Sequence, residues 1–337
     1  MCIVSELKTQ TIRWGILGTG WIAGDFATAL AEIPDARLQA VGSRSKDKAE
    51  LFGGRFNIPN RHSSYESLVS DPDIDVIHIA TPHPFHKEHA LLALEHGKAV
   101  LCEKPFTMNA VEAKAIIDCA RVNGVFAMEA MWGRFTPGQA KVRELLAQSA
   151  VGDVLSFSGH FGASKEYDLS NRFFNLTLGG GALLDVGIYP LSLMFMVLGV
   201  PNSVQSVARI GPSGVDESFA ASFGYANGKI ATVSGTIRTK TPREAVIAGS
   251  EGYIKVSSPL TFAPEVSLHR HGEDPQFYDT SYKGWGFIFE AKETMRCLRE
   301  NLGESPLLPL DETRAIMQTM DTMRAQWTLH YPCENGG

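Results

Sequence analysis

The sequence predicts two domains, an α/β domain of alternating strands and helices and then an α+β domain with a large open antiparallel sheet. The chain has 337 residues, more than a single hydrophobic core usually serves. Up to about residue 130, short β-rich runs alternate with helical patterns, which is typical of βαβ units around a parallel sheet. Beyond residue 150, longer β-like runs follow one another through turn signals, which indicates hairpins. We expect the domains to span residues 1–132 and 133–337.

In the first domain, the helix expected at 21–32 has the clearest pattern, because its apolar residues recur on one face at helical spacing. The other expected helices span 46–56, 86–96 and 110–123. Strands are expected at 11–17, 38–42, 76–80, 99–102 and 125–129.

In the second domain, β-like runs predominate. Ala226-Asn227-Gly228 and Ser250-Glu251-Gly252 are turn signals between consecutive runs, so we expect neighbouring strands to pair in antiparallel fashion. The expected strands span 154–161, 203–210, 218–225, 230–238, 244–248, 253–257 and 265–270. Helices are expected at 137–148, 181–198, 286–301 and 311–328.

A glycine motif directly follows the first expected strand and opens the first expected helix. In WGILGTGWIAGDF, Gly18 permits a tight turn, Gly20 lets the backbone approach a pyrophosphate and Ala23 allows close helix packing. The start of a helix also offers amide donors and a partial positive charge to an anion. This context predicts a Rossmann dinucleotide-binding domain with Gly18, Gly20, Trp21 and Ile22 at the cofactor. A glycine turn without a ligand is the alternative.

The end of the second expected strand indicates which dinucleotide binds. An acid there usually takes the ribose 2′-hydroxyl of NAD, but this chain has Ser43 and Arg44. Arginine pairs with a 2′-phosphate and serine can donate to it, so NADP is the expected cofactor. The alternative is a solvated Arg44 in an enzyme that also accepts NAD.

Composition and charge argue against several classes of partner. The net charge is −6 and no lysine or arginine cluster occurs, so neither nucleic acid nor an anionic membrane is expected. The longest apolar run, 191–200, is too short to cross a bilayer. Five scattered cysteines without a CxxC pair, and an N-terminus without a secretory pattern, indicate a reducing, cytoplasmic location. We therefore expect a small-molecule partner.

Three histidines, His83, His86 and His89, raise the question of a metal site. They do not form HExxH, three-residue steps drift around a helix, and no cysteine lies near them in the sequence. We expect no metal.

Further motifs follow in order along the chain: IATPHPFH, CEKPFTMNAVEA, MEAMWGRFTP, GDVLSFSGHFG, GGGALLDVGIYP and EAKETMRCLRENLGESPLLPLDET. With these the chain resembles the family of glucose-fructose oxidoreductase and inositol dehydrogenase (Gfo/Idh/MocA), from about Thr11 to the last helix. The later motifs look most like the dimeric dihydrodiol dehydrogenase branch, which also contains NADP-dependent D-xylose dehydrogenases. The resemblance implies a second domain that binds substrate and builds a homodimer through its open sheet.

The resemblance also implies roles for single residues. In Glu103-Lys104-Pro105 it places Lys104 at the reacting carbon and often makes Pro105 cis, while Glu103 anchors the loop or lies near the cofactor ribose. Beside the ribose and nicotinamide it places Thr81, Pro82 and His86. Trp132 and Phe161 match residues that line the substrate pocket, and Arg134 contacts cofactor or substrate. For the two aromatic residues, ordinary core packing is the alternative.

One motif departs from the commoner family pattern. Sugar and inositol dehydrogenases usually carry an aspartate with a histidine four residues later, whereas here Asp185 is followed by Tyr189. The dihydrodiol dehydrogenase branch uses this tyrosine as its acid/base. At i and i+4 on a helix, the two side chains share a face and can point together into a cleft.

A phenol is a poor base at neutral pH, because its ordinary pKa is about 10. A lysine ammonium nearby stabilises phenolate, so we expect Tyr189 as the base and Lys104 as the cation that supports it and polarises the substrate oxygen. Asp185 would orient a second hydroxyl or hold Lys104. The alternatives are a solvated Glu103–Lys104 ion pair and a Tyr189 that packs in the core.

The sequence thus predicts an NADP-dependent oxidoreductase that transfers a hydride between nicotinamide and a carbinol carbon of a vicinal diol, either a trans-dihydrodiol or an aldopyranose such as D-xylose. One alternative is another sugar or cyclitol dehydrogenase, or a keto-sugar reductase, with the same residues. A second is a non-enzymatic regulator that senses the dinucleotide. The presence of both Lys104 and Tyr189 argues against that regulator.

Overall fold

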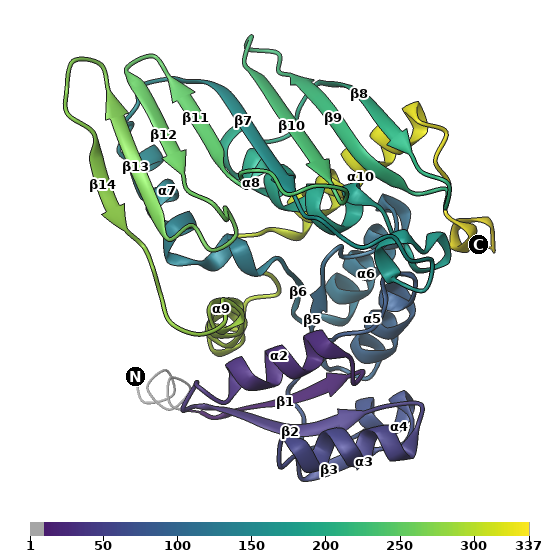
Figure 1. Ribbon diagram of the computed structural model, residues 1–337. Coiled ribbons are helices and arrows are strands. Elements are labelled where there is room, and N and C mark those ends of the chain that lie inside the picture. The colour runs from purple at the N-terminus through teal and green to yellow at the C-terminus, as the bar shows by residue number, and fades with distance from the viewer. Residues whose placement is uncertain (1–9, 337) are drawn as a thin grey trace. The chain divides into compact units, whose positions relative to one another are not determined.

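The structure is a computed structural model that describes residues 10–336. The chain divides into two compact units, each considered by itself (Figure 1). Among the described residues, unit 1 comprises 10–107, 111–130 and 284–313, and unit 2 comprises 108–110, 131–283 and 314–336.

The sequence-based domains, 1–132 and 133–337, differ from this division mainly in the segment 284–313, which belongs to unit 1. Helix α9 (Phe287–Arg299) packs on α2 (Trp21–Leu30), and the Ala127 amide donates to the Gly303 carbonyl oxygen at 3.1 Å. The apolar face of α9 is visible in the sequence, but the element that it packs against is not.

Unit 1 is built on a six-stranded parallel sheet in the order β3-β2-β1-β4-β5-β6. The strands are β1 (Ile12–Leu17), β2 (Ala36–Gly42), β3 (Asn60–His62), β4 (Val76–Ile79), β5 (Ala99–Glu103) and β6 (Ala127–Ala130). The remaining helices of this half of the chain are α3 (Lys46–Arg55), α4 (Tyr65–Val69), α5 (His86–Glu95) and α6 (Ala110–Asn123). The strand order reverses between β1 and β4, and open α/β sheets bind their ligands at such a point.

Most strands of this sheet could be predicted from the sequence because they are buried. Every residue of β4, β5 and β6 is buried, so these strands appear as mostly apolar runs, interrupted by one polar residue each: His78, Glu103 and Glu129. The expected strand ends lie within two residues of the observed ones. The pattern does not predict β3 or α4, because each is short and carries several polar side chains.

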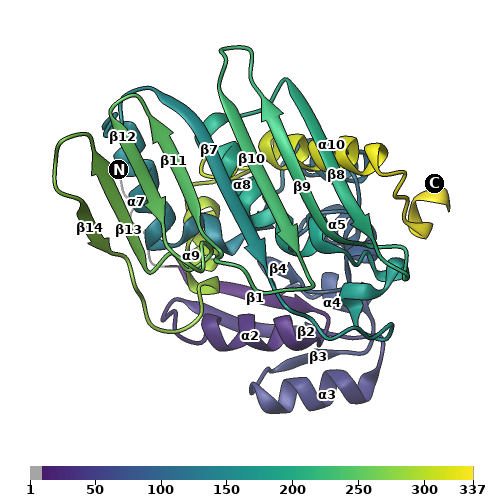
Figure 2. The ribbon, with the colours of Figure 1, turned by 45° about the horizontal axis from the view of Figure 1, so that its top comes forward.

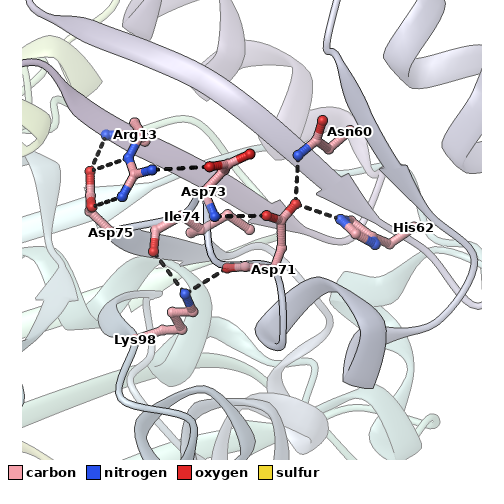
Figure 3. Close-up of polar contacts among 8 residues, drawn as sticks. All are labelled: Arg13, Asn60, His62, Asp71, Asp73, Ile74, Asp75 and Lys98. Atoms are coloured by element: carbon pink, nitrogen blue, oxygen red, sulfur yellow. Dashed lines mark hydrogen bonds and ion pairs between the residues drawn. The ribbon is translucent and has the colours of Figure 1, made fainter.

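Charged side chains gather where the strands of this sheet begin (Figure 3). The amino-edge network, as we call it, consists of Arg13, Asp71, Asp73, Asp75 and Lys98. Arg13 donates to both carboxylate oxygens of Asp75, at 3.1 Å from Nε and 2.7 Å from Nη2. Lys98 Nζ donates to the carbonyl oxygens of Asp71 and Ile74, at 2.6 and 2.9 Å. These bonds tie the segment before β4 to the starts of β1 and β5.

Unit 2 is built on an eight-stranded sheet in the order β14-β13-β12-β11-β7-β10-β9-β8 (Figure 2). The strands are β7 (Val154–Gly162), β8 (Ser203–Ile210), β9 (Asp216–Gly224), β10 (Ile230–Thr236), β11 (Ala245–Gly249), β12 (Gly252–Val256), β13 (Glu265–Arg270) and β14 (Gln276–Asp279). Helices α7 (Pro137–Ala147), α8 (Ile188–Leu198) and the larger part of α10 (Leu310–Gln326) lie along one face (Figures 1 and 2). Short 3₁₀ turns occur at His83–Phe85, Trp132–Phe135, Arg172–Phe174, Leu176–Leu178 and Pro332–Gly336.

The large sheet is mixed, because β7 and β10 pair in parallel. All other neighbouring strands in it are antiparallel, as the hairpin signals predict. β7 reaches its neighbours through a long helical connection and not through a tight turn, so local turn signals do not determine its direction. The sequence also does not predict β14, which is short and largely exposed.

The expected helix at 181–198 is two structures in succession. Residues Leu183–Gly187 form a π-helical turn, and α8 follows directly. By length and composition the segment 176–198 could cross a membrane, contrary to the expectation from its shorter apolar run. However, 78% of its apolar window is buried inside the protein, which is the environment of a core helix.

Candidate active site

The loop after β1 is shaped by glycine. Gly18 has a φ of +108°, which L side chains rarely adopt, and a Cβ there would lie 3.0 Å from the Ala80 carbonyl oxygen. Gly20 precedes α2, and no side chain in the described part of the chain caps the amides that begin this helix. Trp21 is exposed and Ile22 half-buried. The loop therefore fits a pyrophosphate, which the uncapped amides and partial positive charge of α2 would bind.

Arg44 follows β2 and is exposed. Its guanidinium lies 5.8 Å from the centroid of the Phe85 ring, within reach of a cation–π contact. Burial raises the pKa of the Tyr65 phenol, and Arg44 acts in the opposite direction. The buried Ser43 accepts a hydrogen bond from the Ser45 amide at 3.2 Å through its hydroxyl. A cation is thus held at the strand end where the ribose 2′ position of a dinucleotide lies in this fold.

Two histidines hold the loops that follow β4 and β5. The ring nitrogens of the fully buried His86 lie 2.7 Å from the Thr81 carbonyl oxygen and 2.9 Å from that of Pro105. Nδ1 of His89 lies 2.9 Å from the hydroxyl of Thr81. Burial lowers the pKa of His89 to about 4, and the charges of His86 and Arg44 act in the same direction. Burial also lowers the pKa of His86, against the effect of its two carbonyl contacts. The structure therefore shows both histidines as supports for these loops.

Lys104 directly follows β5 and is half-buried. The Lys104–Pro105 bond is cis, as the family resemblance implies. Glu103 is buried, and its Oε1 lies 3.0 Å from Nε2 of His78 on β4. Glu103 therefore anchors the end of β5, which is one of the two roles expected for it.

His83 completes the trio of histidines that was weighed as a metal site. Its ring centroid lies 5.7 Å from that of His86, and the rings meet edge to face. Within residues 10–336, no group of three or more His, Cys, Asp or Glu side chains is arranged to hold a metal ion.

In unit 2, Tyr189 lies in the first turn of α8 beside aromatic rings. The Phe161 ring on β7 stacks with it at 5.3 Å between centroids, and Trp132 meets it edge to face at 6.4 Å. Phe262 packs against Trp132 at 5.1 Å, and the Arg243 guanidinium lies 5.4 Å from the Phe161 centroid. Tyr189 and Trp132 are both half-buried. This aromatic wall suits a planar ring or the apolar face of a sugar.

Asp185 lies in the π-helical turn and is 1% exposed. Nη2 of Arg172 lies 2.8 Å from its Oδ1. Asp216, at the start of β9, is fully buried, and its Oδ2 accepts a hydrogen bond from the Leu183 amide at 2.7 Å. Burial raises the pKa of Asp216 to about 7; backbone hydrogen bonds oppose this shift and the charge of Asp185 adds to it. Turns of π-helix are frequent at functional sites, and this one carries an expected catalytic residue.

Arg134 is buried in unit 2 and bound to α8. Its Nη1 donates to the Ser192 carbonyl oxygen at 2.7 Å and to the Ser192 hydroxyl at 3.3 Å. A small hollow lies here, lined also by Gly133, Tyr189 and Thr261. A contact of Arg134 with cofactor or substrate stays a prediction.

The structure gathers the predicted residues separately in each unit. In unit 1 they lie at or after the ends of β1, β2, β4 and β5: Gly18, Gly20, Trp21, Ile22, Ser43, Arg44, Thr81, Pro82, His86, Glu103 and Lys104. In unit 2 they are Trp132, Arg134, Phe161, Asp185 and Tyr189. Sequence reasoning missed the residues that hold these groups: Tyr65, Phe85, Arg172, Asp216 and Arg243. Phe85 lies in the IATPHPFH motif, which could have identified it; the other four belong to no motif or periodic pattern.

The parallel sheet, with a glycine loop at its switch point and uncapped amides at the start of α2, defines a dinucleotide-binding protein of the Rossmann type. Residues 12–131 match the oxidoreductase family with an NAD-binding Rossmann fold, and residues 139–255 match the GFO/IDH/MocA C-terminal domain. The chain therefore belongs to the Gfo/Idh/MocA family, and it is an NAD(P)-dependent dehydrogenase acting on CH–OH groups.

Curated relatives match this chain over nearly its full length. It is 36% identical over 336 residues to trans-1,2-dihydrobenzene-1,2-diol dehydrogenase of Mus musculus, a match that covers 96% of this chain and 99% of that protein. The protein of the same name from Xenopus tropicalis is 37% identical over 332 residues, covering 95% and 99%. The Homo sapiens protein is 33% identical over 334 residues, covering 96% and 99%.

Solved structures share the fold. Levoglucosan dehydrogenase in complex with NADH and levoglucosan has a TM-score of 0.87 and 23% identity, covering 95% of this chain and 98% of that one. KijD10, a 3-ketoreductase from Actinomadura kijaniata in complex with NADP and TDP-benzene, has a TM-score of 0.82 and 23% identity, covering 94% and 98%.

Proposed function

We propose that this enzyme transfers a hydride between NADP and a carbinol carbon of a vicinal diol, either a trans-dihydrodiol or an aldopyranose such as D-xylose. The observation that carries the proposal is the aromatic wall of Phe161 and Trp132 beside Tyr189. A flat dihydrodiol ring or the apolar face of a pyranose packs on such a wall. Relatives named trans-1,2-dihydrobenzene-1,2-diol dehydrogenase support the same substrate class. The cytoplasmic location expected from the cysteine pattern is part of this proposal.

In this proposal Tyr189 takes the proton of the reacting hydroxyl, and Lys104 polarises the oxygen that loses it. The nicotinamide, when bound, accepts the hydride from the carbon. A tyrosine base requires a cation that stabilises phenolate, and Lys104 supplies it. Asp185, whose charge is offset by Arg172 at 2.8 Å, orients the second hydroxyl of the diol.

NADP is proposed over NAD because of Arg44. Its guanidinium lies 5.8 Å from the centroid of the Phe85 ring, and this contact orients it before a ligand arrives. A pre-ordered arginine fork loses less conformational entropy when it pairs with a phosphate. NAD lacks that phosphate and gains nothing from this arrangement.

The test is reduction of NADP, with NAD in parallel, over a panel of pentoses, hexoses and trans-dihydrodiols. We expect turnover with a trans-dihydrodiol or D-xylose and a preference for NADP of about tenfold or more. Tyr189→Phe should lose most of kcat with cofactor affinity unchanged. Tyr225→Phe, which removes the hydroxyl of another half-buried tyrosine of unit 2, should retain the kcat of the wild type.

Two outcomes would overturn the proposal in different directions. Turnover confined to the reduction of keto-sugars would establish a reductase. Tight NADP binding without turnover in either direction would establish the dinucleotide-sensing regulator.

We also propose that a homodimer forms through the open face of the large sheet. Helices lie along the opposite face, whereas the open face holds a broad hollow lined by small polar side chains, among them Ser158, Ser222 and Thr232. In sedimentation experiments the wild type should be a dimer, and Thr232→Arg should be a monomer. Lys229→Glu, in the exposed turn before β10, is the control that leaves the dimer intact. A monomeric wild type at every concentration would contradict the proposal.

A further inference from the structure

A positively charged side chain, Arg243, lies at the aromatic wall of unit 2. Its guanidinium lies 5.4 Å from the centroid of the Phe161 ring. The same ring stacks with Tyr189 at 5.3 Å between centroids. Phe161 therefore contacts both the proposed base and a cation to which the proposed reaction assigns no role.

The backbone of the large sheet holds Arg243 in this place. Ala245 of β11 lies opposite Gly159 of β7, and the two strands are antiparallel. Arg243, two residues before Ala245, therefore comes to lie beside Phe161 on the same side of the sheet. The Arg243 amide donates to the Ser258 hydroxyl at 3.2 Å, which fixes the chain just before β11 begins.

Arg243 differs from the other described arginines of unit 2 that are at least half-buried. Within residues 10–336, its guanidinium makes no hydrogen bond and no ion pair, and none of its nitrogens is sealed from solvent. The others each donate to an acceptor within unit 2: Arg134, Arg143, Arg172, Arg270 and Arg324. A half-buried charge without a partner is unfavourable, so the donors of Arg243 suit a ligand that brings an acceptor with it.

The acids closest to Arg243 in the sequence and at the proposed site already have partners. Glu244 points to the other side of the strand, where Nζ of Lys255 lies 3.1 Å from its carboxylate. Asp185 pairs with Arg172 at 2.8 Å. The charge of Arg243 is therefore not needed to neutralise either acid, and it remains available to an anion.

The chemistry of the guanidinium indicates the kind of anion. Its planar fork of N–H donors matches the two oxygens of a carboxylate. We propose that Arg243 binds a carboxylate on the ring of the substrate, so that the enzyme prefers acidic aldopyranoses, the uronates, to neutral ones. This inference rests on the proposed function, because it takes Phe161 and Tyr189 as parts of the substrate site.

The carboxylate takes no part in the reaction. The hydride leaves the carbinol carbon for the nicotinamide, the hydroxyl proton passes to Tyr189, and a carbonyl group remains. Arg243 is thus a specificity-determining residue, which holds the ring while another of its carbons reacts.

Three sugars that differ only in the substituent on C5 of the pyranose ring test the preference. D-xylose carries hydrogen there, D-glucose a hydroxymethyl group and D-glucuronate a carboxylate. We expect kcat/KM for D-glucuronate to exceed that for D-glucose about tenfold or more, because only the carboxylate forms charged hydrogen bonds with Arg243. The gain should lie in KM, since the carboxylate is bound equally well in the ground state and the transition state.

Variants of Arg243 test whether this residue causes the preference. Arg243→Gln should lower the ratio of kcat/KM for D-glucuronate to that for D-glucose about tenfold to a hundredfold. Arg243→Lys, which keeps the charge but not the fork, should restore part of the ratio. Arg270→Gln is the matched control and should keep the ratio of the wild type, because Arg270 is a half-buried arginine of the same sheet that donates to the Ala150 carbonyl oxygen at 3.0 Å. A loss of folding would affect both sugars alike and leave the ratio unchanged.

D-glucose 6-phosphate distinguishes the two anions that an arginine fork can bind. We expect its kcat/KM to be lower than that of D-glucuronate. A higher value that is lost in Arg243→Gln would overturn the assignment of a carboxylate and identify a sugar phosphate as the substrate.

The inference and the proposed function fail in different ways. If neutral diols are oxidised but D-glucuronate has no advantage over D-glucose, or if Arg243→Gln keeps the ratio of the wild type, the inference is overturned and the proposed function stands. If no diol is oxidised, the proposed function fails, and calorimetric titration of D-glucuronate into the enzyme with bound NADPH decides the inference. Binding that is about tenfold weaker in Arg243→Gln would support the carboxylate site, whereas equal or absent binding would overturn it.

Discussion

The two edges of the parallel sheet in unit 1 both carry several carboxyl groups, but they treat them differently. At the amino edge, Arg13 binds Asp75 through two nitrogens, and Asp71 accepts from Asn60 and His62 (Figure 3). At the carboxyl edge, Oε1 of Glu103 lies 3.0 Å from Nε2 of His78, and Glu129 accepts hydrogen bonds from the Phe106 amide and the Thr313 hydroxyl. Arginine binds the acids of the amino edge, whereas a histidine, an amide and a hydroxyl meet those of the carboxyl edge. In the function proposed above, only the carboxyl edge carries a catalytic residue, Lys104.

The two lysines that flank β5 give the largest contrast. Lys104→Met should lower kcat about a thousandfold with NADP affinity retained, because the substrate oxygen loses its cation. Lys98→Met, at the other end of the same strand, should leave kcat within about twofold but lower the free energy of unfolding by about 1 to 3 kcal/mol. Its ammonium donates to the Asp71 and Ile74 carbonyl oxygens. Steady-state kinetics measure kcat, and urea unfolding measures the free energy of unfolding. Equal losses of kcat in Lys104→Met and Lys98→Met would contradict a difference in function between the two edges.

A buried acid of unit 2, Asp216, gives the second contrast. Asp216 is fully buried with a pKa of about 7, against an ordinary 3.8, so between about pH 4 and about pH 7 only the unfolded chain releases its proton. The stability contribution of Asp216 therefore falls as pH rises through this range. Between these pH values, the free energy of unfolding of Asp216→Asn should rise relative to that of the wild type by about 2 to 4 kcal/mol. Asp168→Asn, which alters a fully exposed acid, is the control. If the difference in unfolding free energy between Asp216→Asn and the wild type narrowed with rising pH, the result would contradict a raised pKa of Asp216.

The two ends of β2 offer a contrast of intermediate size. Arg44→Ala should lower kcat/KM for NADP about tenfold to a hundredfold and leave NAD nearly unchanged, because only NADP has the phosphate. Arg37→Ala, near the start of the same strand and also exposed, should affect neither cofactor. Equal losses with NADP and NAD would show that Arg44 does not contact a 2′-phosphate.

The smallest expected effect concerns the amino-edge network alone. Asp75→Asn should cost about 1 kcal/mol of unfolding free energy, since the bidentate partner, Arg13, is 37% exposed and solvent screens the pair. Asp73 is 58% exposed and reaches Arg13 only at 3.3 Å, so Asp73→Asn should cost about 0.3 kcal/mol or less. Urea unfolding resolves the two, and kcat should stay unchanged in both. A loss of kcat in either variant would give the amino edge a catalytic role.

Much of the fold could be predicted because buried strands leave short, mostly apolar runs. The strands β1, β2, β4, β5 and β6 follow this rule, and their ends lie close to the predicted ones. The pattern does not predict β3, which is short and polar, or β14, which is short and largely exposed. The parallel pairing of β7 with β10 and the place of α9 in unit 1 depend on long connections, about which local patterns carry no information.

The candidate site was predictable only where a motif marks it. Gly18, Lys104 and Tyr189 lie in contiguous patterns, so each could be assigned a role from sequence. Arg172 and Asp216 could not, because their importance comes from groups that approach them only in the folded chain.

The central claim is that the carboxyl edge of this sheet serves a hydride transfer between a diol carbon and NADP. Its most direct test uses D-xylose and a trans-dihydrodiol carrying deuterium on the carbinol carbons, with mass spectrometry of the reduced cofactor. The account predicts that NADPH acquires deuterium at C4 of the nicotinamide with at least one of these diols, and that Lys104→Met abolishes the transfer. Unlabelled NADPH, or no reduced cofactor with any diol, would contradict it.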